Sequence, residues 1–378
     1  MAVDNSAMPL KILIVPDKFK GTLTAAEAAA VIARGWRAGR PGDALTLVPM
    51  SDGGDGFGEV LSTLLGAEVR AVQTVDAAHR PVQAHWWWHE PTRMAVVESA
   101  RVIGLAMLPR GKYHPFDLDT LGLAAVLQAA AAQGAGRCCI GIGGSATNDG
   151  GFGLARGLGW EFLDEDGERI LAWTELSRLA ALRPPARPRL FEELIVAVDV
   201  QNPLLGQAGC SRVYGPQKGL TEFDAAERAL SRMAEVVQAQ SGANHALTPG
   251  AGAAGGLGFG LLAFAGARVE SGFAVFERHA RLTERIRAAD LVVTGEGALD
   301  AQTVMGKGVG EVADLCLRLG VPCFGLAGVV TDPAQAQTKF KLARGLTELT
   351  EKETALANPG YWLEELARRV AVAFKDEA

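Results

Sequence analysis

The side chains that could do chemistry in this chain are carboxylates, lysines and hydroxyls set among glycines in a few short segments. One segment, GIGGSATNDGG at 141–151, follows an apolar run and contains Ser145, Thr147, Asn148 and Asp149. Consecutive glycines leave backbone N–H groups free to surround an anion, and a following helix would add its N-terminus. The lysine that a P-loop carries after its last glycine is missing here. Taken alone, the segment fits a phosphate-binding turn and a tight strand–helix turn equally well.

Other carboxylates stand at the ends of apolar runs. In SDGGDG (51–56), Asp52 and Asp55 flank paired glycines. A plain turn is the commoner explanation of such a string, although carboxylates and glycines also suit Mg²⁺ or hydroxyl groups. Asp199 ends the run LIVAVD, where a carboxylate could accept a hydroxyl proton or bind a metal.

Two further segments add lysines to this inventory. TGEGALDAQTVMGK (294–307) follows the run LVV and holds Glu296, Asp300 and Lys307 within a short reach. PDKFKG places Asp17 beside two lysines, at positions 18 and 20, which offer the positive charge that the 141–151 segment lacks. Carboxylates, lysines, hydroxyls and glycines suit Mg²⁺-assisted phosphoryl transfer, which depends on positioning and charge neutralisation.

Other chemistries find less support. None of the six histidines lies in these segments, and the absence of HxH or HExxH spacing argues against zinc. GxSxG is absent, which argues against a serine hydrolase. Gly250, Gly252 and Gly255 formally match GxGxxG, but the polar stretch before them does not look like the strand that a dinucleotide site needs. We therefore expect these glycines to pack closely or to lie near phosphate, and keep a nicotinamide-dependent oxidoreductase as a distant alternative.

Six apolar runs of similar design must position these groups. Each is short, continuous and stopped by glycine or a polar residue, as expected for buried parallel strands. Ligands of open parallel sheets bind outside the carboxyl ends of the strands, where the candidate residues stand. The segments are 10–21, 44–56, 138–151, 193–203, 290–300 and 321–330.

Helices are expected between these strands, which makes the fold class α/β. Residues 24–40 open with a capping box, and 222–240 and 361–375 are amphipathic at helical period. The runs 69–75, 81–89 and 93–100 are joined by short turns and predict an antiparallel meander. In this meander Trp86 and Trp88 share one face, and we expect them to pack in a core. A meander inside an α/β chain indicates a second, inserted domain.

The whole chain sets the remaining expectations. Its 378 residues suggest two domains. A net charge of −6 gives no reason to expect nucleic acid or a membrane as partner. The five cysteines form no CxxC pair, and the N-terminus lacks a signal peptide pattern. We expect a cytoplasmic protein; its oligomeric state is not indicated.

With these segments assembled, the chain resembles the class I, bacterial-type glycerate kinases nearly from end to end. The resemblance rests on ordered motifs that are individually ambiguous: KILIVPDKFKGTLTAAEAA, PMSDGGDG, IGIGGSATNDGGFG, VAVDVQNPLLG, YGPQKG, PGAGAAGGLGFGLLAF and LVVTGEGALDAQT. It implies ATP- and Mg²⁺-dependent phosphorylation of D-glycerate, usually at the 2-hydroxyl, to give 2-phospho-D-glycerate and ADP.

The resemblance also implies two α/β domains with the active site in the cleft between them. A Rossmann- or flavodoxin-like domain with a parallel sheet would be built from both chain ends, residues 1–68 and 286–378. Residues 69–285 would form the inserted mixed α/β domain with the meander.

The motif positions of the family carry over to this chain residue by residue, and we assign a role to each. Asp199 would be the base or orient the glycerate hydroxyl, and Lys18 or Lys20 would pair with the glycerate carboxylate or a phosphoryl oxygen. The full assignment is Asp199 and Lys20 as catalytic; Asp17, Lys18, Asp52, Gly53, Gly54, Asn202 and Lys218 for substrate; Gly143, Gly144, Ser145, Thr147, Asn148, Asp149 and Lys307 for phosphate or nucleotide; Glu296 and Asp300 for Mg²⁺.

The chain departs from the family pattern at two positions, and several functions stay open. Ala298 stands where relatives often have arginine, and Ala124 where a second glycine is common. A glycerate 3-kinase or a kinase of a related small hydroxy acid remains an alternative, because regiochemistry depends on the fine placement of two neighbouring hydroxyls. A hydroxy-acid-binding protein without activity is a third class.

Overall fold

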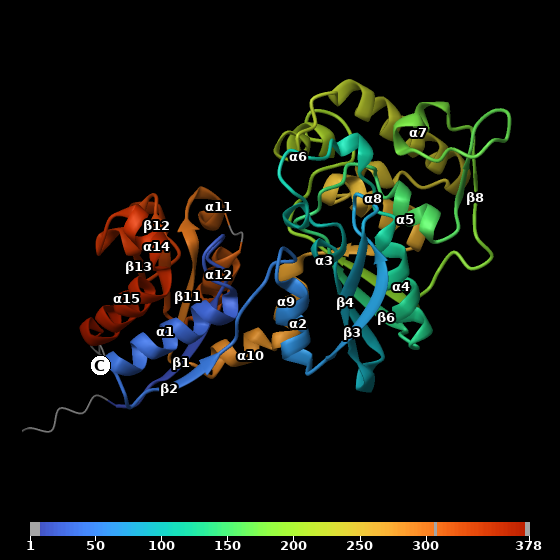
Figure 1. Ribbon diagram of the computed structural model, residues 1–378. Coiled ribbons are helices and arrows are strands. Elements are labelled where there is room, and N and C mark those ends of the chain that lie inside the picture. The colour runs from blue at the N-terminus through green and yellow to red at the C-terminus, as the bar shows by residue number, and fades with distance from the viewer. Residues whose placement is uncertain (1–7, 306–307, 375–378) are drawn as a thin grey trace, which may run out of the picture. The chain divides into compact units, whose positions relative to one another are not determined.

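The computed structural model describes residues 8–305 and 308–374, which form two compact units (Figure 1). Unit 1 contains the residues up to Ser51 and those from Phe276 onward, and unit 2 runs from Asp52 to Val275. The division differs from the expected bounds at 68 and 285. The reason at the first crossing is that helix α2 (Phe57–Leu65) buries Phe57 and Leu61 in the same apolar cluster as Trp87 of unit 2.

Unit 1 is built on a five-stranded sheet in which every neighbouring pair is parallel. Its strands are β1 (Lys11–Pro16), β2 (Ala44–Leu47), β11 (Leu291–Leu299), β12 (Cys323–Val330) and β13 (Leu342–Gly345), in the order β13-β12-β11-β1-β2. Counted along unit 1, this is the flavodoxin-like order 2-1-3-4-5. The expected parallel domain made from both chain ends is confirmed.

Helices α1 (Ala25–Gly39) and α15 (Pro359–Ala373) cover one face of this sheet. Their apolar sides pack with alternate strand residues such as Ile12 and Ile14, as the two-residue period of a strand requires. The capping box expected at Thr24 and Glu27 is present. The remaining helices of unit 1 are α10 (Leu282–Arg287), α11 (Ala301–Val304), α12 (Val309–Leu319), α13 (Pro333–Ala336) and α14 (Lys352–Ala357), while α9 (Gly272–Ala280) begins in unit 2 and ends in unit 1.

Unit 2 contains a six-stranded mixed sheet in the order β10-β9-β6-β5-β4-β3. Strands β3 (Glu68–Val75), β4 (Pro81–His89) and β5 (Met94–Glu98) form the expected antiparallel meander. From β5 onward the sheet is parallel, through β6 (Arg137–Gly141) and β9 (Glu193–Ala197) to β10 (Arg268–Glu270). All six predicted apolar runs therefore form parallel strands.

The tryptophans of β4 pack on opposite faces of this sheet. Trp86 and Trp88 lie in the cluster formed with α4 (Gly122–Ala132) and α8 (Ala253–Ala265), whereas Trp87 lies in the smaller cluster with α2. The packing role expected for Trp86 and Trp88 is confirmed. A third cluster joins α5 (Phe152–Gly157), α6 (Cys210–Lys218) and α7 (Phe223–Ser241), and a short pair of strands, β7 (Glu161–Leu163) and β8 (Ala181–Arg183), lies beside them.

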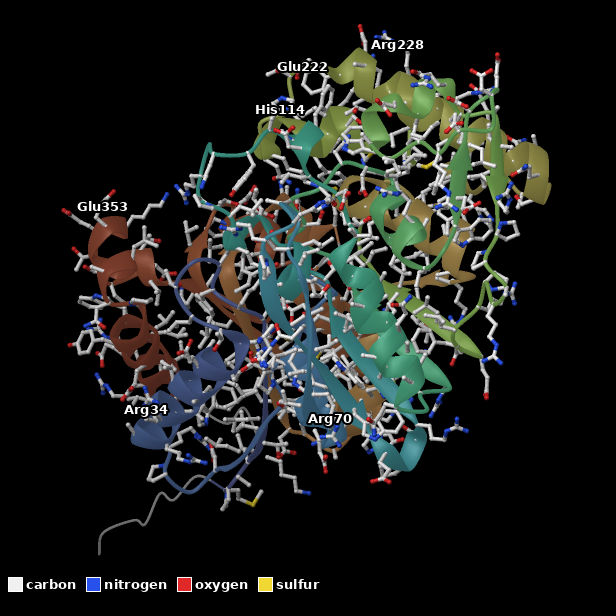
Figure 2. All side chains as sticks on the ribbon, turned by 45° about the vertical axis from the view of Figure 1, so that its right-hand side comes forward. Arg34, Arg70, His114, Glu222, Arg228 and Glu353 are labelled. Carbon is white, nitrogen blue, oxygen red and sulfur yellow. The ribbon has the colours of Figure 1, made fainter. Side chains whose placement is uncertain are left out.

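Charged side chains occupy the outside of each unit. Arg34 on α1 and Arg70 on the edge strand β3 are two examples, each ion-paired with a glutamate (Figure 2). Charges on an edge strand discourage pairing with another sheet. In the part of the chain that the structure describes, no helix combines the length and apolarity needed to cross a membrane.

Candidate active site

The carboxyl ends of four parallel strands carry the candidate residues of unit 2. Strand β6 leads into the 141–151 loop, β9 into Asp199, and β10 into Ser271 at the start of α9. Glu98 closes β5 and accepts hydrogen bonds from the backbone N–H groups of Gly56 and Gly58. The sequence predicted the strand ends of β6 and β9 in this arrangement, but not those of β5 and β10.

Backbone contacts hold these strand ends and the 51–56 loop together. Gly53 has a φ of +96°, and a Cβ atom there would lie 2.7 Å from the carbonyl oxygen of Ala197. A Cβ atom on Gly272 would lie 2.0 Å from the carbonyl oxygen of Asp52. Gly143 N–H donates to the carbonyl oxygen of Gly53, with an N–O distance of 3.4 Å. The 51–56 loop therefore contacts the last residue of β9 and the segments after β6 and β10.

Asp199 is held through one oxygen of its carboxylate. The Ser271 hydroxyl donates to Oδ1 at 2.9 Å, and the N–H groups of Gly272 and Phe273 also hydrogen-bond to the carboxylate. Oδ2 is buried and has no hydrogen-bond partner among the described residues. Burial, and then the charge of Asp52, raise the pKa of Asp199 to about 7, although the three hydrogen bonds act to lower it. A carboxylate with this pKa can gain or lose a proton near neutral pH.

Asn202 stabilises the loop that follows Asp199. Its Oδ1 accepts a 2.6 Å hydrogen bond from the Tyr214 hydroxyl, and its Nδ2 donates to the carbonyl oxygen of Ala208 at 2.8 Å. Its own carbonyl oxygen accepts from Gly252 N–H. Asn202 thus joins the β9 loop to α6 and to the glycine-rich segment before α8.

The 141–151 loop presents only part of itself to solvent. Gly144 is exposed and Gly143 half-buried, whereas Ser145 is 4% exposed and Thr147 is fully buried. Lys218 of α6 donates to the carbonyl oxygen of Thr147 at 2.6 Å and lies 3.5 Å from Ser145 Oγ. Burial lowers the pKa of Lys218 to about 8, against the raising effects of Cys210 and Asp149.

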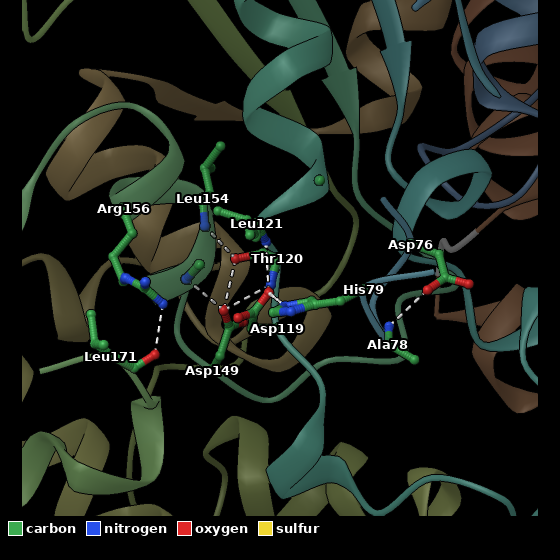
Figure 3. A network of polar contacts seen from close by, with 12 residues as sticks. Asp76, Ala78, His79, Asp119, Thr120, Leu121, Asp149, Leu154, Arg156 and Leu171 are labelled. Carbon is green, nitrogen blue, oxygen red and sulfur yellow. Dashed lines mark hydrogen bonds and ion pairs between the residues drawn. The ribbon is translucent and has the colours of Figure 1, made fainter. Parts of the chain in front are cut away.

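Asn148 and Asp149 are fully buried and bond to the protein interior. Asn148 Nδ2 donates to Ser211 Oγ at 2.9 Å. Asp149 Oδ2 accepts from both the N–H and the hydroxyl of Thr120, and from Gly153 N–H at the start of α5 (Figure 3). Burial, and then the charge of Asp119, raise the pKa of Asp149 to about 6. The buried side of the loop is thus held in place by hydrogen bonds of Thr147, Asn148 and Asp149.

The glycine-rich segment 250–258 packs against the same loop. Ser145 Oγ donates to the carbonyl oxygen of Ala254, and Gly150 N–H donates to that of Gly255. A Cβ atom on Gly255 would lie 1.9 Å from the carbonyl oxygen of Thr147, so close packing, one of the two roles expected for these glycines, is confirmed at this position. The element just before Gly250 is the short 3-10 helix His245–Leu247, so the strand that the nicotinamide alternative needs is missing at this position.

The candidate residues of unit 1 meet where β1 and β11 lie side by side. Asp17 N–H donates to the carbonyl oxygen of Gly295 at 2.8 Å, and the Asp17 carboxylate accepts from Lys18 N–H at 2.7 Å. Lys18 is half-buried and Lys20 exposed. In the 2-1-3-4-5 order, β1 and β11 flank the switch point of the sheet, which is where ligands bind in folds of this type.

Glu296 and Asp300 lie at the end of β11 and share Thr303 as a partner. The Thr303 hydroxyl donates to Glu296 Oε1 at 2.7 Å, and Thr303 N–H donates to Asp300 Oδ1 at 3.3 Å. Asp300 is also the N-cap of α11. The predicted phosphate-binding Lys307 lies outside the described residues. The place of the active site between the two domains stays a prediction.

Sequence reasoning missed Ser271, Ser211 and Thr120. Ser271 follows β10, a strand of three residues that is too short to stand out as an apolar run. Ser211 and Thr120 bond to loop residues 63 and 29 positions away in the chain, and a distance of that kind leaves no local pattern.

Comparison with known proteins gives the family directly. The family model described as the glycerate kinase family matches residues 12–375. The chain belongs to the glycerate kinase family. The resemblance drawn from the motifs and the expected enzyme class, a kinase, are therefore confirmed.

Individual relatives of this glycerate kinase family member cover most of its length. It is 37% identical over 372 residues to a glycerate kinase of Halalkalibacterium halodurans, covering 96% of this chain and 97% of that protein. It is 38% identical over 329 residues to a glycerate 2-kinase of Escherichia coli, covering 85% and 86%. A crystal structure named for glycerate kinase 2 of Salmonella typhimurium LT2 aligns with a TM-score of 0.82 and 32% identity over 96% of this chain and 97% of that one.

Proposed function

We propose that this protein transfers the γ-phosphoryl group of ATP to D-glycerate in the presence of Mg²⁺, at the 2-hydroxyl, to give 2-phospho-D-glycerate and ADP. The observation that carries the proposal is Asp199, whose Oδ1 is held by Ser271 while Oδ2 is buried with no partner among the described residues. The glycerate 2-kinase of Escherichia coli among its relatives supports the choice of hydroxyl.

Asp199 would act as the base or orient the substrate hydroxyl. When ionised, Oδ2 accepts the hydroxyl proton as the glycerate oxygen attacks the γ-phosphorus and the bond from phosphorus to the ADP oxygen breaks. A general base works best when its pKa lies near the working pH, and the pKa of Asp199, raised to about 7 by burial and by Asp52, meets this condition.

The anionic groups of both substrates need positive or hydrogen-donating partners. Lys18 or Lys20 would pair with the glycerate carboxylate or a phosphoryl oxygen. The backbone N–H groups near Gly143 and Gly144, the part of the 141–151 loop least buried, would donate to a second anionic group, either an ATP phosphate or the glycerate carboxylate. Lys218 would hold this loop in its binding conformation through its hydrogen bond to the Thr147 carbonyl oxygen.

Glu296 and Asp300 fit a Mg²⁺ ion of the kind that kinases use. Such an ion is commonly held by one or two carboxylates together with substrate phosphates. Within the described residues, no three His, Cys, Asp or Glu side chains form a metal-binding group, so the proposed site has two carboxylates from the protein. Mg²⁺ would neutralise phosphate charge, and Thr303 orients both carboxylates.

The test is turnover by the full chain, followed by ADP release with D-glycerate, ATP and Mg²⁺. Phosphorus NMR of the product distinguishes the 2-phosphate from the 3-phosphate, and a 3-phosphate would replace the proposed regiochemistry with the 3-kinase alternative. Asp199→Asn should lower kcat by about 10²–10⁴-fold, while Asp224→Asn, at an exposed carboxylate of α7, should retain activity. Absence of glycerate-dependent turnover in the wild type would overturn the proposal.

A further inference from the structure

Ser271 has its hydroxyl hydrogen directed at Asp199 by a second bond. Ser271 Oγ accepts the N–H of Ala274 in the first turn of α9, with an N–O distance of 3.3 Å. A serine hydroxyl carries one hydrogen, and the oxygen lone pair that faces α9 is already occupied. The hydrogen is therefore directed to Asp199 Oδ1, at an O–O distance of 2.9 Å.

This arrangement makes the two oxygens of Asp199 unequal. Oδ1 is bound by Ser271, and the N–H groups of Gly272 and Phe273 also hydrogen-bond to the carboxylate. Oδ2 has no hydrogen-bond partner in the described part of the chain. These hydrogen bonds fix the plane of the carboxylate, so the oxygen without a partner always points in the same direction.

A charged side chain of a neighbouring loop acts on Asp199. Asp52, from the 51–56 loop, acts on it electrostatically. On β10, Glu270 is ion-paired with Arg268. The first turn of α9 carries no charged side chain before Glu277. Among the described residues, Ser271 is the side chain that donates a hydrogen bond to Asp199, and the charge of Asp52 opposes the ionisation of this carboxylate.

We propose that Ser271 is a positioning residue of the phosphoryl transfer: it fixes Oδ1 of Asp199 so that Oδ2 alone meets the substrate hydroxyl, and it favours the ionised form of this carboxylate. The inference rests on the proposed function of Asp199. It adds a residue that acts through Asp199 and does not itself touch the substrate.

The experiment is a series of variants at this position, assayed with the full chain. Ser271→Ala removes the donor, Ser271→Cys keeps a weak one, and Ser271→Thr keeps the hydroxyl. Ser231→Ala is the matched control, because Ser231 also donates to a carboxylate, that of Glu235, on the exposed side of α7. For each variant, kcat, the KM for glycerate and the pH profile of kcat/KM are measured, together with thermal melting.

In Ser271→Ala we expect kcat to fall about tenfold or more, and the acid limb of kcat/KM to move up by about one pH unit, since a hydrogen bond to a charged group is lost. Ser271→Cys should be intermediate, and Ser271→Thr should restore both values. If Ser271 served only as a cap of α9, through its bond to Ala274 N–H, Ser271→Ala would lower the melting temperature but leave the acid limb of kcat/KM at the same pH.

The outcomes separate this inference from the proposed function. If the wild type turns over glycerate but the acid limb is the same in Ser, Cys and Ala variants, Ser271 has no positioning role and the kinase activity stands. If the Ala variant does not fold, the Cys and Thr variants still decide the question. No turnover by the wild type removes the basis of both.

Discussion

Lys218 Nζ and the carbonyl oxygen of Thr147 are joined by a hydrogen bond of 2.6 Å, although 71 positions separate the two residues. The bond ties α6 to the 141–151 loop. Lys218 is 8% exposed, so its charge lies behind the loop. A P-loop carries its lysine within the loop, whereas here a distant helix brings an ammonium group to the loop backbone.

Removing this ammonium group should damage the loop. Lys218→Met keeps most of the length and volume of the side chain but leaves the Thr147 carbonyl oxygen without its donor. We expect kcat/KM for the kinase reaction to fall at least about tenfold, since misplacing a binding loop is costly to catalysis. Lys352→Met, at an exposed lysine of α14, is the control. Steady-state kinetics with both substrates measure the effect, and activity within twofold of wild type would contradict it.

The pH dependence of activity should report on Asp199. Because burial and Asp52 raise its pKa to about 7, the carboxylate is protonated below that pH and ionised above it. Activity that needs the ionised form is therefore half-maximal at a pH of about 7 and levels off only above that pH. Asp52→Asn removes the repulsion, so the acid limb should move to lower pH. Asp55→Asn, in the same loop, should leave the pH of the acid limb unchanged. An acid limb at the same pH in Asp52→Asn as in the wild type would refute the electrostatic effect of Asp52 on Asp199.

The same carboxylate should also make stability depend on pH. Its pKa is about 7 in the folded protein and about 3.9 in an unfolded chain, so the folded state holds the proton more tightly. The contribution of Asp199 to the free energy of unfolding is therefore largest below a pH of about 4 and is lost as the pH rises through about 7. Asp199→Asn removes the free-energy cost of burying an ionised carboxylate. The melting temperature of this variant should therefore be about 2–4 °C above that of the wild type at pH 8, and the difference should vanish near pH 4. Calorimetry at the two pH values checks this.

Close packing of Gly272 on the 51–56 loop gives a steric prediction. The Cβ atom of Gly272→Ala would approach the carbonyl oxygen of Asp52 to 2.0 Å, so the loop or α9 must shift. We expect at least about a tenfold loss of kcat, because Ser271 and Asp199 would shift with the helix start. Gly136→Ala meets only atoms of the Glu192 carboxylate at 3.4 Å and should behave as wild type. Equal behaviour of the two variants would show that this contact is not needed.

Thr120 should matter for stability because it links Asp149 to α5. Thr120→Val keeps the shape of the side chain but removes the hydroxyl that donates to Asp149 Oδ2 and accepts from Leu154 N–H (Figure 3). Buried groups left without partners should cost about 1–3 kcal/mol of unfolding free energy. Thr63→Val, at an exposed threonine of α2, should change stability by less than about 0.5 kcal/mol. Chemical denaturation measures both.

The strands and helices with a strong local signal could be predicted from the sequence. Continuous apolar runs predicted β1, β6, β9, β11 and their neighbours, and a capping box predicted the start of α1. The place of α2 could not be predicted, because its membership of unit 2 is decided by Phe57 and Leu61 packing near Trp87, a contact with no local pattern.

The candidate site likewise contains residues that could be predicted from the sequence and residues that could not. Asp199, Glu296 and the 141–151 loop are marked by their positions at strand ends. The partners that give them their properties come from distant parts of the chain: Ser271 lies 72 positions from Asp199, and Lys218 lies 71 from Thr147. Only the folded chain brings such pairs together.

The two crossings of the chain between its compact units have a practical consequence. The chain leaves unit 1 after Ser51 and re-enters it at Phe276. Asp52 stands at the first crossing, and α9, whose first turn holds Asp199, runs through the second. A cut at either point, the obvious way to express the inserted unit by itself, would place Asp52 or the first turn of α9, which set the acidity of Asp199, at a new chain end. An isolated unit 2 should therefore retain its sheet but not a correctly tuned carboxylate.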